Sequence, residues 1–341
     1  MRVKTEEAIR ALRGALKLYG FEETSGIELI KYRENYVFRL TRETGDSYAM
    51  RLHRAGYRTD DEIRTELAYL QVLGEQGLSV PEVVPTLDGE PMCRVQAEDG
   101  TDFQLDVQRW IEASQPLGDV AEALAGTSSL EPETFRRLGI LAAELHERTT
   151  AVERVCSFQR RAWDSDGLVG DAALWGDPLA VDGLGRDDAA LLRSAMARLK
   201  RELDVMDTSA DGYGVIHADL TPENVLVQDG RLIMIDFDDF GEGWHLFDLA
   251  TILFWYQPHP QYEAYRRELF EGYSSVRPLP AHYPASWEAM LLARGLTYLG
   301  WAGERSGDPE AAFIAEQVVP MVLEQARHYI STTISPARTG S

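Results

Sequence analysis

The sequence predicts an α+β protein built from a small, antiparallel, β-rich N-terminal lobe over residues 1–108 and a larger, mainly helical C-terminal lobe over residues 114–341. Two observations support this fold class. Short runs of alternating apolar and polar residues, separated by turn signals, fill the first part, and long stretches with apolar residues at helical spacing fill the second. Residues 109–113 are predicted to join the two lobes as a hinge.

The N-terminal lobe begins with an apolar stripe that predicts a helix over residues 5–19. A second helix is predicted over residues 60–74, where Ile63, Leu67 and Leu70 share one face. The strands of this lobe are separated by Gly-containing turns such as Asp99-Gly100. They are predicted over residues 29–32, 35–40, 48–52, 83–84 and 103–107.

The C-terminal lobe consists mostly of amphipathic segments. These predict helices over residues 131–150, 187–207, 245–256, 261–273, 285–305 and 309–331. Residues 164–186 are rich in Gly, Asp, Trp and Pro and predict a loop or insert. Most aromatic side chains of the helices are expected in the core rather than in an acceptor pocket. They are Trp244, His245, Trp255, Tyr256, Tyr262, Tyr298 and Trp301.

A β-hairpin interrupts the helical lobe. Two apolar runs, 225–227 and 232–235, flank Asp229-Gly230, which is a strong signal for a tight turn. Because a hairpin brings its outer ends together, Asn224 and Asp236 should lie side by side. Amide and carboxylate oxygens suit Mg²⁺, which takes few protein ligands when phosphates complete its shell.

The polar loop before this hairpin contains a second acid, Asp219, next to the apolar run 214–216. Acid, amide and acid in this order match the needs of phosphoryl transfer. One carboxylate accepts the proton of an attacking hydroxyl, while an amide and another carboxylate hold metal on the nucleotide phosphates. The alternative is a polar turn followed by an ordinary hairpin, in which His217 packs in the core and Asp238 and Asp239 are solvated.

These residues carry a family resemblance. His-x-Asp-x-x-x-x-Asn at 217–224 and Ile-Asp-Phe-Asp-Asp at 235–239 resemble the catalytic loop and metal motif of the aminoglycoside phosphotransferase and choline kinase superfamily, the phosphotransferase enzyme family. The nearest branch by resemblance is the bacterial stress-response Ser/Thr kinase or homoserine kinase type II group. The resemblance implies a protein-kinase-like fold, with Asp219 as the catalytic residue, Asn224 and Asp236 as metal ligands, and Asp248 bracing the catalytic loop.

The nucleotide side of the site also follows from this resemblance. Arg51 stands where the family usually carries a strand lysine, and Glu66 stands at the position of its ion-pair glutamate. An arginine contacts phosphate as a planar fork rather than as a point charge. An exposed strand arginine is the alternative reading of Arg51, and Lys31 is a second candidate cation.

The sequence has no Gly-x-Gly-x-x-Gly loop to cover the phosphates. Residues 32–38 resemble the family's Glu-Asn-x-Val-Tyr segment, so Glu34 and Asn35 are the candidates for that role. At the hinge, the backbones of Arg109 and Ile111 are expected to contact adenine.

The amino-acid composition limits the classes of partner and the compartment that we expect. The formal net charge of −22 argues against nucleic acid and acidic membrane surfaces as partners. The two cysteines form no framework, which favours a reducing cytoplasm. Only four of the 34 basic residues are lysines, so an arginine at position 51 fits the composition.

Motifs and resemblance together predict an ATP- and Mg²⁺-dependent phosphotransferase that moves the γ-phosphate to a hydroxyl of a small molecule, such as an amino alcohol or an aminoglycoside. A Ser/Thr protein kinase of the bacterial stress-response type and a regulatory nucleotide-binding pseudokinase are the alternatives. The expected partners are ATP and the acceptor, without nucleic acid or membrane, and the expected state is a monomer or homodimer. The identity of the acceptor stays open.

Overall fold

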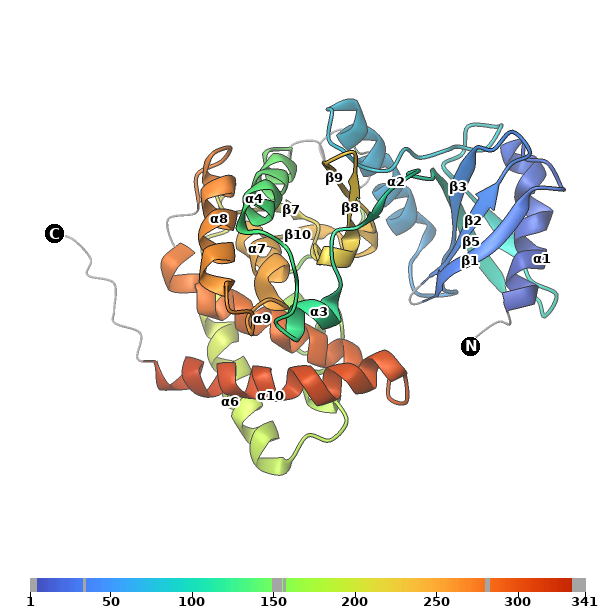
Figure 1. Ribbon diagram of the computed structural model, residues 1–341. Coiled ribbons are helices and arrows are strands. Elements are labelled where there is room, and N and C mark those ends of the chain that lie inside the picture. Colours follow the sequence, from blue (N-terminus) through green and yellow to red (C-terminus); the bar gives the residue numbers. More distant parts are fainter. Residues whose placement is uncertain (1–4, 33–34, 149–154, 156–157, 280–282, 333–341) are drawn as a thin grey trace. The chain divides into compact units, whose positions relative to one another are not determined.

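The computed structural model describes residues 5–32, 35–148, 155, 158–279 and 283–332 (Figure 1). The chain forms two compact units. The first comprises Met1–Leu117, Arg148–Arg160 and Pro222–Asp238, and the second comprises Gly118–Glu147, Arg161–Thr221 and Asp239–Ser341, each as far as it is described. The predicted α+β class is confirmed, with an antiparallel sheet near the N-terminus and mostly helices toward the C-terminus. The predicted lobe boundaries at 108–114 stay a prediction. The hairpin that the prediction assigned to the helical lobe groups with the first unit.

The first unit contains a five-stranded antiparallel sheet in the order β1-β2-β3-β5-β4. Its strands are β1 (Gly26–Tyr32), β2 (Tyr36–Thr41), β3 (Ser47–Leu52), β4 (Met92–Gln96) and β5 (Asp102–Arg109). Two helices belong to the same unit, α1 (Thr5–Ala15), continued by the 3-10 turn η1 (Leu16–Tyr19), and α2 (Asp60–Glu75). The strand predicted over residues 83–84 is not formed; Val83 instead makes an isolated β-bridge with Gln108.

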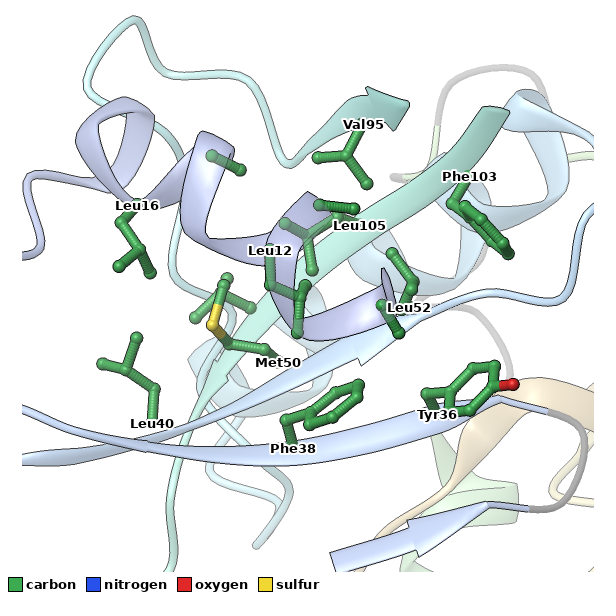
Figure 2. Close-up of a cluster of buried hydrophobic side chains, with 14 of the residues drawn as sticks. Leu12, Leu16, Tyr36, Phe38, Leu40, Met50, Leu52, Val95, Phe103 and Leu105 are labelled. Carbon is green, nitrogen blue, oxygen red and sulfur yellow. The ribbon is translucent and has the colours of Figure 1, made fainter. Parts of the chain in front are cut away.

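One face of this sheet packs against α1 and forms the core of the unit (Figure 2). Side chains alternate between the two faces of a strand, so Met50 and Leu52 on β3 join this core. Arg51, between them, points to the opposite face. The same alternation on β5 places Leu105 in the core and Asp106 on the face of Arg51, and these two polar residues are direct cross-strand partners.

Helix α2 starts at a capping box. The Thr59 hydroxyl accepts from the backbone N–H of Glu62, and the Glu62 carboxylate accepts from the backbone N–H of Thr59. These bonds satisfy donors that the first turn would otherwise leave unpaired. The helix then buries Ile63, Leu67 and Leu70 together with Glu66. A glutamate on the buried face of a helix requires a charged partner.

The predicted hairpin is present as β8 (Val225–Gln228) and β9 (Arg231–Met234), with β6 (Gln115–Pro116) as a third strand. Asp229 and Gly230 both adopt positive φ, 47° and 76°, as a type I′ turn requires. The 3-10 turns η4 (Pro222–Asn224) and η5 (Phe237–Asp239) flank the two strands. The sequence alone therefore located this element to within about a residue.

The second unit is mainly helical and has one two-stranded sheet, β7 (Tyr213–Ile216) with β10 (Gly241–Trp244). Its helical elements, coloured green to red in Figure 1, run in chain order. They are α3 (Val120–Leu124), α4 (Pro132–Glu147), α5 (Ser165–Val169), η3 (Pro178–Ala180), α6 (Arg186–Leu203), α7 (His245–Phe254), α8 (Tyr262–Ser274), α9 (Tyr283–Gly303) and α10 (Pro309–Ser331).

Glycines set how closely these helices approach. A Cβ on Gly139 of α4 would lie 2.0 Å from the Leu269 carbonyl oxygen of α8, and one on Gly272 would lie 1.9 Å from the Arg136 carbonyl oxygen. The α4–α8 backbones are therefore in direct contact. Helix α9 is buried continuously from Ala289 to Gly300. Of the aromatic side chains expected in the core, five are buried, as predicted: Trp244, His245, Trp255, Tyr256 and Tyr298. Tyr262 and Trp301 are partly buried.

Several short elements were not predicted: β4, β6, β10, α3 and, within the expected loop 164–186, α5 and η3. Within the part of the chain that the structure describes, none of the helices has the length and apolar character to cross a membrane.

Candidate active site

The loop after β7 is held by a buried carboxylate on α7. Asp248 accepts hydrogen bonds from the backbone N–H groups of His217, at 2.9 Å, and Ala218, at 2.8 Å. His146 Nε2 lies 3.1 Å from the same carboxylate. Burial acts to raise the pKa of Asp248, but hydrogen bonding and charge from His146 outweigh it and lower the pKa below its usual value. The predicted bracing of the loop by Asp248 is confirmed.

The backbone just before Asp219 is strained. Ala218 has φ of 68°, a left-handed conformation that costs a non-glycine residue about 1 kcal/mol or more. Such conformations persist where surrounding contacts enforce them, often at functional sites. Here they are enforced from both sides, by Asp248 on the N–H of Ala218 and by Arg294 on its carbonyl. The result is a fixed position for the next residue, Asp219.

Arg294 of α9 binds Asp219 directly and was missed by the sequence analysis. Its Nη2 donates to Asp219 Oδ1 at 2.6 Å, and its Nη1 donates to the Ala218 carbonyl at 3.0 Å. The arginine side chain is fully buried, whereas that of Asp219 is 23% exposed. A signal existed in the sequence, because Arg294 is the single charged residue in the apolar run from Ala289 to Gly300.

The hairpin places the two predicted metal ligands at neighbouring positions within the first unit. The Ile235 N–H donates to the Asn224 carbonyl at 3.0 Å, so Asp236 follows directly after the backbone partner of Asn224. Asp236 is exposed and has φ of 65°, while Asn224 is buried. An amide oxygen and a carboxylate at adjacent positions form a donor set that fits Mg²⁺, with its remaining ligands from phosphates and water.

The other two acids of the motif are not solvated. Asp238 is buried, and Arg58 Nη2 donates to its carbonyl at 2.7 Å and lies 3.7 Å from its carboxylate. Arg160 also donates to this carbonyl. In the second unit, Asp239 accepts from the Trp175 indole at 3.2 Å through its carboxylate and from the Trp163 indole at 2.8 Å through its carbonyl. Both acids anchor the chain around the motif.

The predicted pair on the nucleotide side forms a buried charge cluster. Arg51 Nη2 lies 2.8 Å from a Glu66 oxygen and 3.0 Å from an Asp106 oxygen. His53 Nε2 lies 2.6 Å from Asp106. Burial disfavours ionisation of Asp106, but the charge of Arg51 and the hydrogen bond from His53 bring its pKa below the usual value. Burial raises the pKa of Glu66 despite the opposing charge of Arg51. Asp106 was not predicted.

The remaining predicted contacts lie at the ends of sheet strands. Asn35 is buried and its Oδ1 accepts from the Arg54 N–H at 3.2 Å, while Glu34 lies outside the described residues. The Arg109 N–H donates to the Glu82 carbonyl at 2.8 Å, so it is engaged within the protein. The Ile111 carbonyl accepts from Ser114 Oγ at 2.7 Å.

A sheet with a buried Arg–Glu pair, together with a braced acid–amide–acid segment, defines the class of phosphotransferases with a protein-kinase-like fold. The chain belongs to the phosphotransferase enzyme family, whose model matches residues 27–279. The predicted family is therefore confirmed.

Individual relatives agree with this assignment. Amicoumacin kinase of Bacillus subtilis (strain 168) is 26% identical over 255 residues, which cover 74% of this chain and 70% of that protein. The solved structure of the microcompartment-associated aminopropanol kinase superposes with a TM-score of 0.82 at 29% identity, covering 95% of this chain and 98% of that one. Amicoumacin kinase hAmiN, solved with AMP-PNP, Ca²⁺ and Ami, shares the fold, with a TM-score of 0.73 at 21% identity over 94% of each chain.

The chain is thus an ATP-dependent kinase of this family that phosphorylates an alcohol group of a small molecule. The predicted reaction class and the small-molecule acceptor are confirmed. The roles of the individual site residues stay predictions.

Proposed function

We propose that this protein transfers the γ-phosphate of ATP to the hydroxyl of a small amino alcohol, with Asp219 accepting the hydroxyl proton. The observation that carries the proposal is the fixed but partly exposed carboxylate of Asp219. Arg294 and the strained Ala218 peptide hold one of its sides, and 23% of the side chain faces solvent. A carboxylate held in this way is suited to orient an acceptor oxygen.

In the proposed reaction, the acceptor oxygen attacks the γ-phosphorus as its proton passes to Asp219. The bond from that phosphorus to the bridging oxygen breaks, and ADP leaves. This kind of transfer depends mainly on positioning and charge neutralisation rather than on strong bases. A rigidly positioned carboxylate is therefore sufficient.

We assign the metal to Asn224 and Asp236, which the hairpin holds at adjacent positions. Mg²⁺ bound there would neutralise charge on the phosphate oxygens. Asn224 supplies a buried amide at the end of η4, and Asp236 supplies an exposed carboxylate just after β9. The structure of hAmiN with a nucleotide analogue and a divalent cation supports binding of a metal together with the nucleotide in this family.

We assign the nucleotide to four groups of the first unit. Arg51, held by Glu66 and Asp106, would contact the phosphates, and Asn35 would support the loop that covers them. Because the Arg109 N–H is engaged by Glu82, its carbonyl and the Ile111 N–H are the groups that we assign to adenine.

We further propose that the acceptor carries an amine as well as the hydroxyl. The aminopropanol kinase that superposes on this chain acts, by its name, on an amino alcohol. The net charge of −22 favours cationic ligands. Glu242 is exposed on β10 and pairs with Val215 of β7, the strand that leads into the Asp219 loop. We therefore propose Glu242 as a contact for the ammonium group.

Matched acceptor pairs test this proposal. ATP consumption would be measured with amino alcohols and with alcohols that lack only the amine, alongside aminoglycosides, sugars and casein. Mass spectrometry would identify the phosphate ester formed. We expect turnover with at least one amino alcohol and a loss of about 10-fold or more in kcat/KM for its deaminated partner. Equal turnover of both partners would refute amine recognition, and phosphate on casein alone would support the protein-kinase alternative.

The proposal also includes the cellular compartment of the reaction. We place the reaction in the cytoplasm, because ATP is available there and the two cysteines give no sign of a disulfide framework.

A further inference from the structure

We propose that Arg294 is the positioning residue for Asp219, and that the segment from Trp163 to Ala180 holds this arginine in place. The inference rests on the proposed role of Asp219 as the proton acceptor. It concerns residues far apart in the sequence, since 75 positions separate Arg294 from Asp219.

The guanidinium of Arg294 binds two successive residues of the loop. One terminal nitrogen binds Asp219 Oδ1 at 2.6 Å, and the other binds the Ala218 carbonyl at 3.0 Å. This is not the usual fork in which both nitrogens bind one carboxylate. By binding the carboxylate and the preceding peptide together, Arg294 fixes the rotation of the carboxylate relative to its own backbone. This bond engages Oδ1 of the Asp219 carboxylate.

Arg294 and Asp219 also compensate each other's charge. A buried arginine requires a compensating anion, and the hydrogen bond shows that Asp219 supplies it. In return, the guanidinium offsets the negative charge of Asp219, which lowers the repulsion between this carboxylate and the anionic phosphate.

Aromatic rings lie close to the guanidinium of Arg294. Its central carbon lies 4.0 Å from the ring centre of Tyr298, 4.5 Å from that of Trp175 and 5.5 Å from that of Phe247. Rings at these distances attract a cation and restrict its rotation. Two of them are fixed in turn: Trp175 donates to Asp239 at 3.2 Å, and Tyr298 accepts from the Trp255 indole at 2.8 Å.

The Trp163–Ala180 segment closely approaches the backbone of α9. A Cβ on Gly300 would lie 2.4 Å from the Gly176 carbonyl oxygen, and one on Gly303 would lie 2.9 Å from the Ala180 Cβ. Two glycines on α9 thus allow this segment to lie directly on the helix. The contact places Trp175 over Arg294, which stands on the same helix. The glycines therefore permit this close approach, at the cost of an intrinsically less stable helix.

The test compares Arg294→Ala and Arg294→Lys with a matched control, Arg305→Ala. Arg305 also lies over an aromatic ring, 4.4 Å from the centre of Trp301, and its Nη1 donates to the Trp301 carbonyl at 3.1 Å. Thermal unfolding identifies variants that fold. In these we expect Arg294→Ala to lower kcat by about 100-fold with KM for ATP nearly unchanged. Arg294→Lys should lose less, and Arg305→Ala should keep the wild-type kcat.

Chemical rescue separates positioning from a purely structural role. Guanidinium ion, at concentrations that do not unfold the protein, should restore part of kcat in Arg294→Ala and none in Asp219→Asn. If Arg294→Ala fails to fold, kcat would be compared in Arg294→Lys and Gly300→Ala instead. Both keep Asp219 and are expected to disturb its contact with residue 294. Wild-type kcat in a folded Arg294 variant would overturn the inference while leaving the proposed function standing.

Chemical labelling tests the inference even if no acceptor substrate is found. Carbodiimide with glycine ethyl ester converts accessible carboxyls to amides, and mass spectrometry maps them. Labelling of Asp219 should rise in Arg294→Ala relative to wild type, while labelling of Glu242 stays constant. Unchanged labelling of Asp219 would refute the inference even if no acceptor is found. Absence of turnover with altered labelling would instead count against the proposed function alone.

Discussion

The guanidinium of Arg51 lies 2.8 Å from the carboxylate of Glu66, with side-chain exposures of 7% and 0%. The resemblance predicts that this pair replaces the lysine and glutamate usual in the family. The structure adds Asp106, 3.0 Å from the same guanidinium and itself bound to His53. Two buried carboxylates on one arginine explain why arginine is tolerated here, because its planar head has several donors to share among them.

The cluster predicts a strong effect on stability. Arg51→Met leaves two buried carboxylates without their cation, and we expect it to lower the free energy of unfolding by about 3–5 kcal/mol. Urea unfolding measures this change. Arg94→Met is the matched control: its arginine also pairs with an aspartate, but it is 56% exposed. The control should lose less than about 1 kcal/mol. Equal losses in the two variants would contradict the buried-cluster account.

The brace on the catalytic loop predicts a loss of both stability and activity. Asp248→Asn keeps the size of the side chain but replaces one acceptor oxygen with a donor, which then opposes the N–H of His217 or Ala218. We expect about 1–3 kcal/mol of destabilisation and at least about a 10-fold lower kcat. Asp204→Asn, which alters a surface pair with Lys200, is the control. A stable and fully active Asp248→Asn protein would show that the loop does not depend on this brace.

The hairpin predicts a metal requirement at two positions. Asp236→Ala and Asn224→Ala should each weaken nucleotide binding measured by calorimetry in the presence of Mg²⁺. Chelation of the metal with EDTA should abolish transfer in the wild-type protein. Asp229→Asn, in the turn of the same hairpin, provides the control, because asparagine also tolerates the positive φ of this position. The metal assignment fails if Asp236→Ala binds Mg-ATP as tightly as this control.

A buried histidine predicts a pH dependence of stability. His245 stacks on His146 with ring centres 4.3 Å apart. Burial, with added charge repulsion from His146 and Arg277, holds the pKa of His245 well below its ordinary value of 6.5. The unfolded chain therefore takes up a proton below pH 6.5 that the folded chain does not, and stability falls as the pH drops through this value.

The expected slope is about 1.4 kcal/mol per pH unit once the unfolded histidine is protonated. His245→Phe keeps the stacked ring and should remove this slope between about pH 6 and pH 5. Asp106 and Asp248 have lowered pKa values, so their stabilising contribution is lost only below the ordinary carboxyl pKa of 3.8. An identical pH profile in His245→Phe and wild type would assign the dependence to other groups.

Local sequence patterns predicted the parts of the site that depend on neighbours in the chain. The Asp229-Gly230 turn fixed the hairpin, and the hairpin fixed Asn224 against Ile235. Helix α2 and strand β3 were also found at nearly their observed bounds, because their apolar spacing follows the period of each element.

Long-range contacts account for what the sequence analysis missed. Asp106 joins Arg51 across 55 positions, and Arg294 joins Asp219 across 75. No local period encodes such pairs, although a lone charge in an apolar run marks one of them. Strand β10 escaped prediction for a related reason. It contains Gly241 and Gly243, which disfavour strands, yet a Cβ on Gly241 would lie 2.5 Å from the Arg161 carbonyl oxygen, so packing requires glycine there.

The most direct test of the account is transfer of radiolabelled γ-phosphate to an accepted amino alcohol by wild type and by Asp219→Asn, with ATP binding measured in both. The substitution keeps the shape of the side chain and removes its capacity to take a proton. We predict that Asp219→Asn loses at least about 100-fold in kcat and binds Mg-ATP nearly as well as wild type. Undiminished phosphate transfer by Asp219→Asn would contradict the central claim.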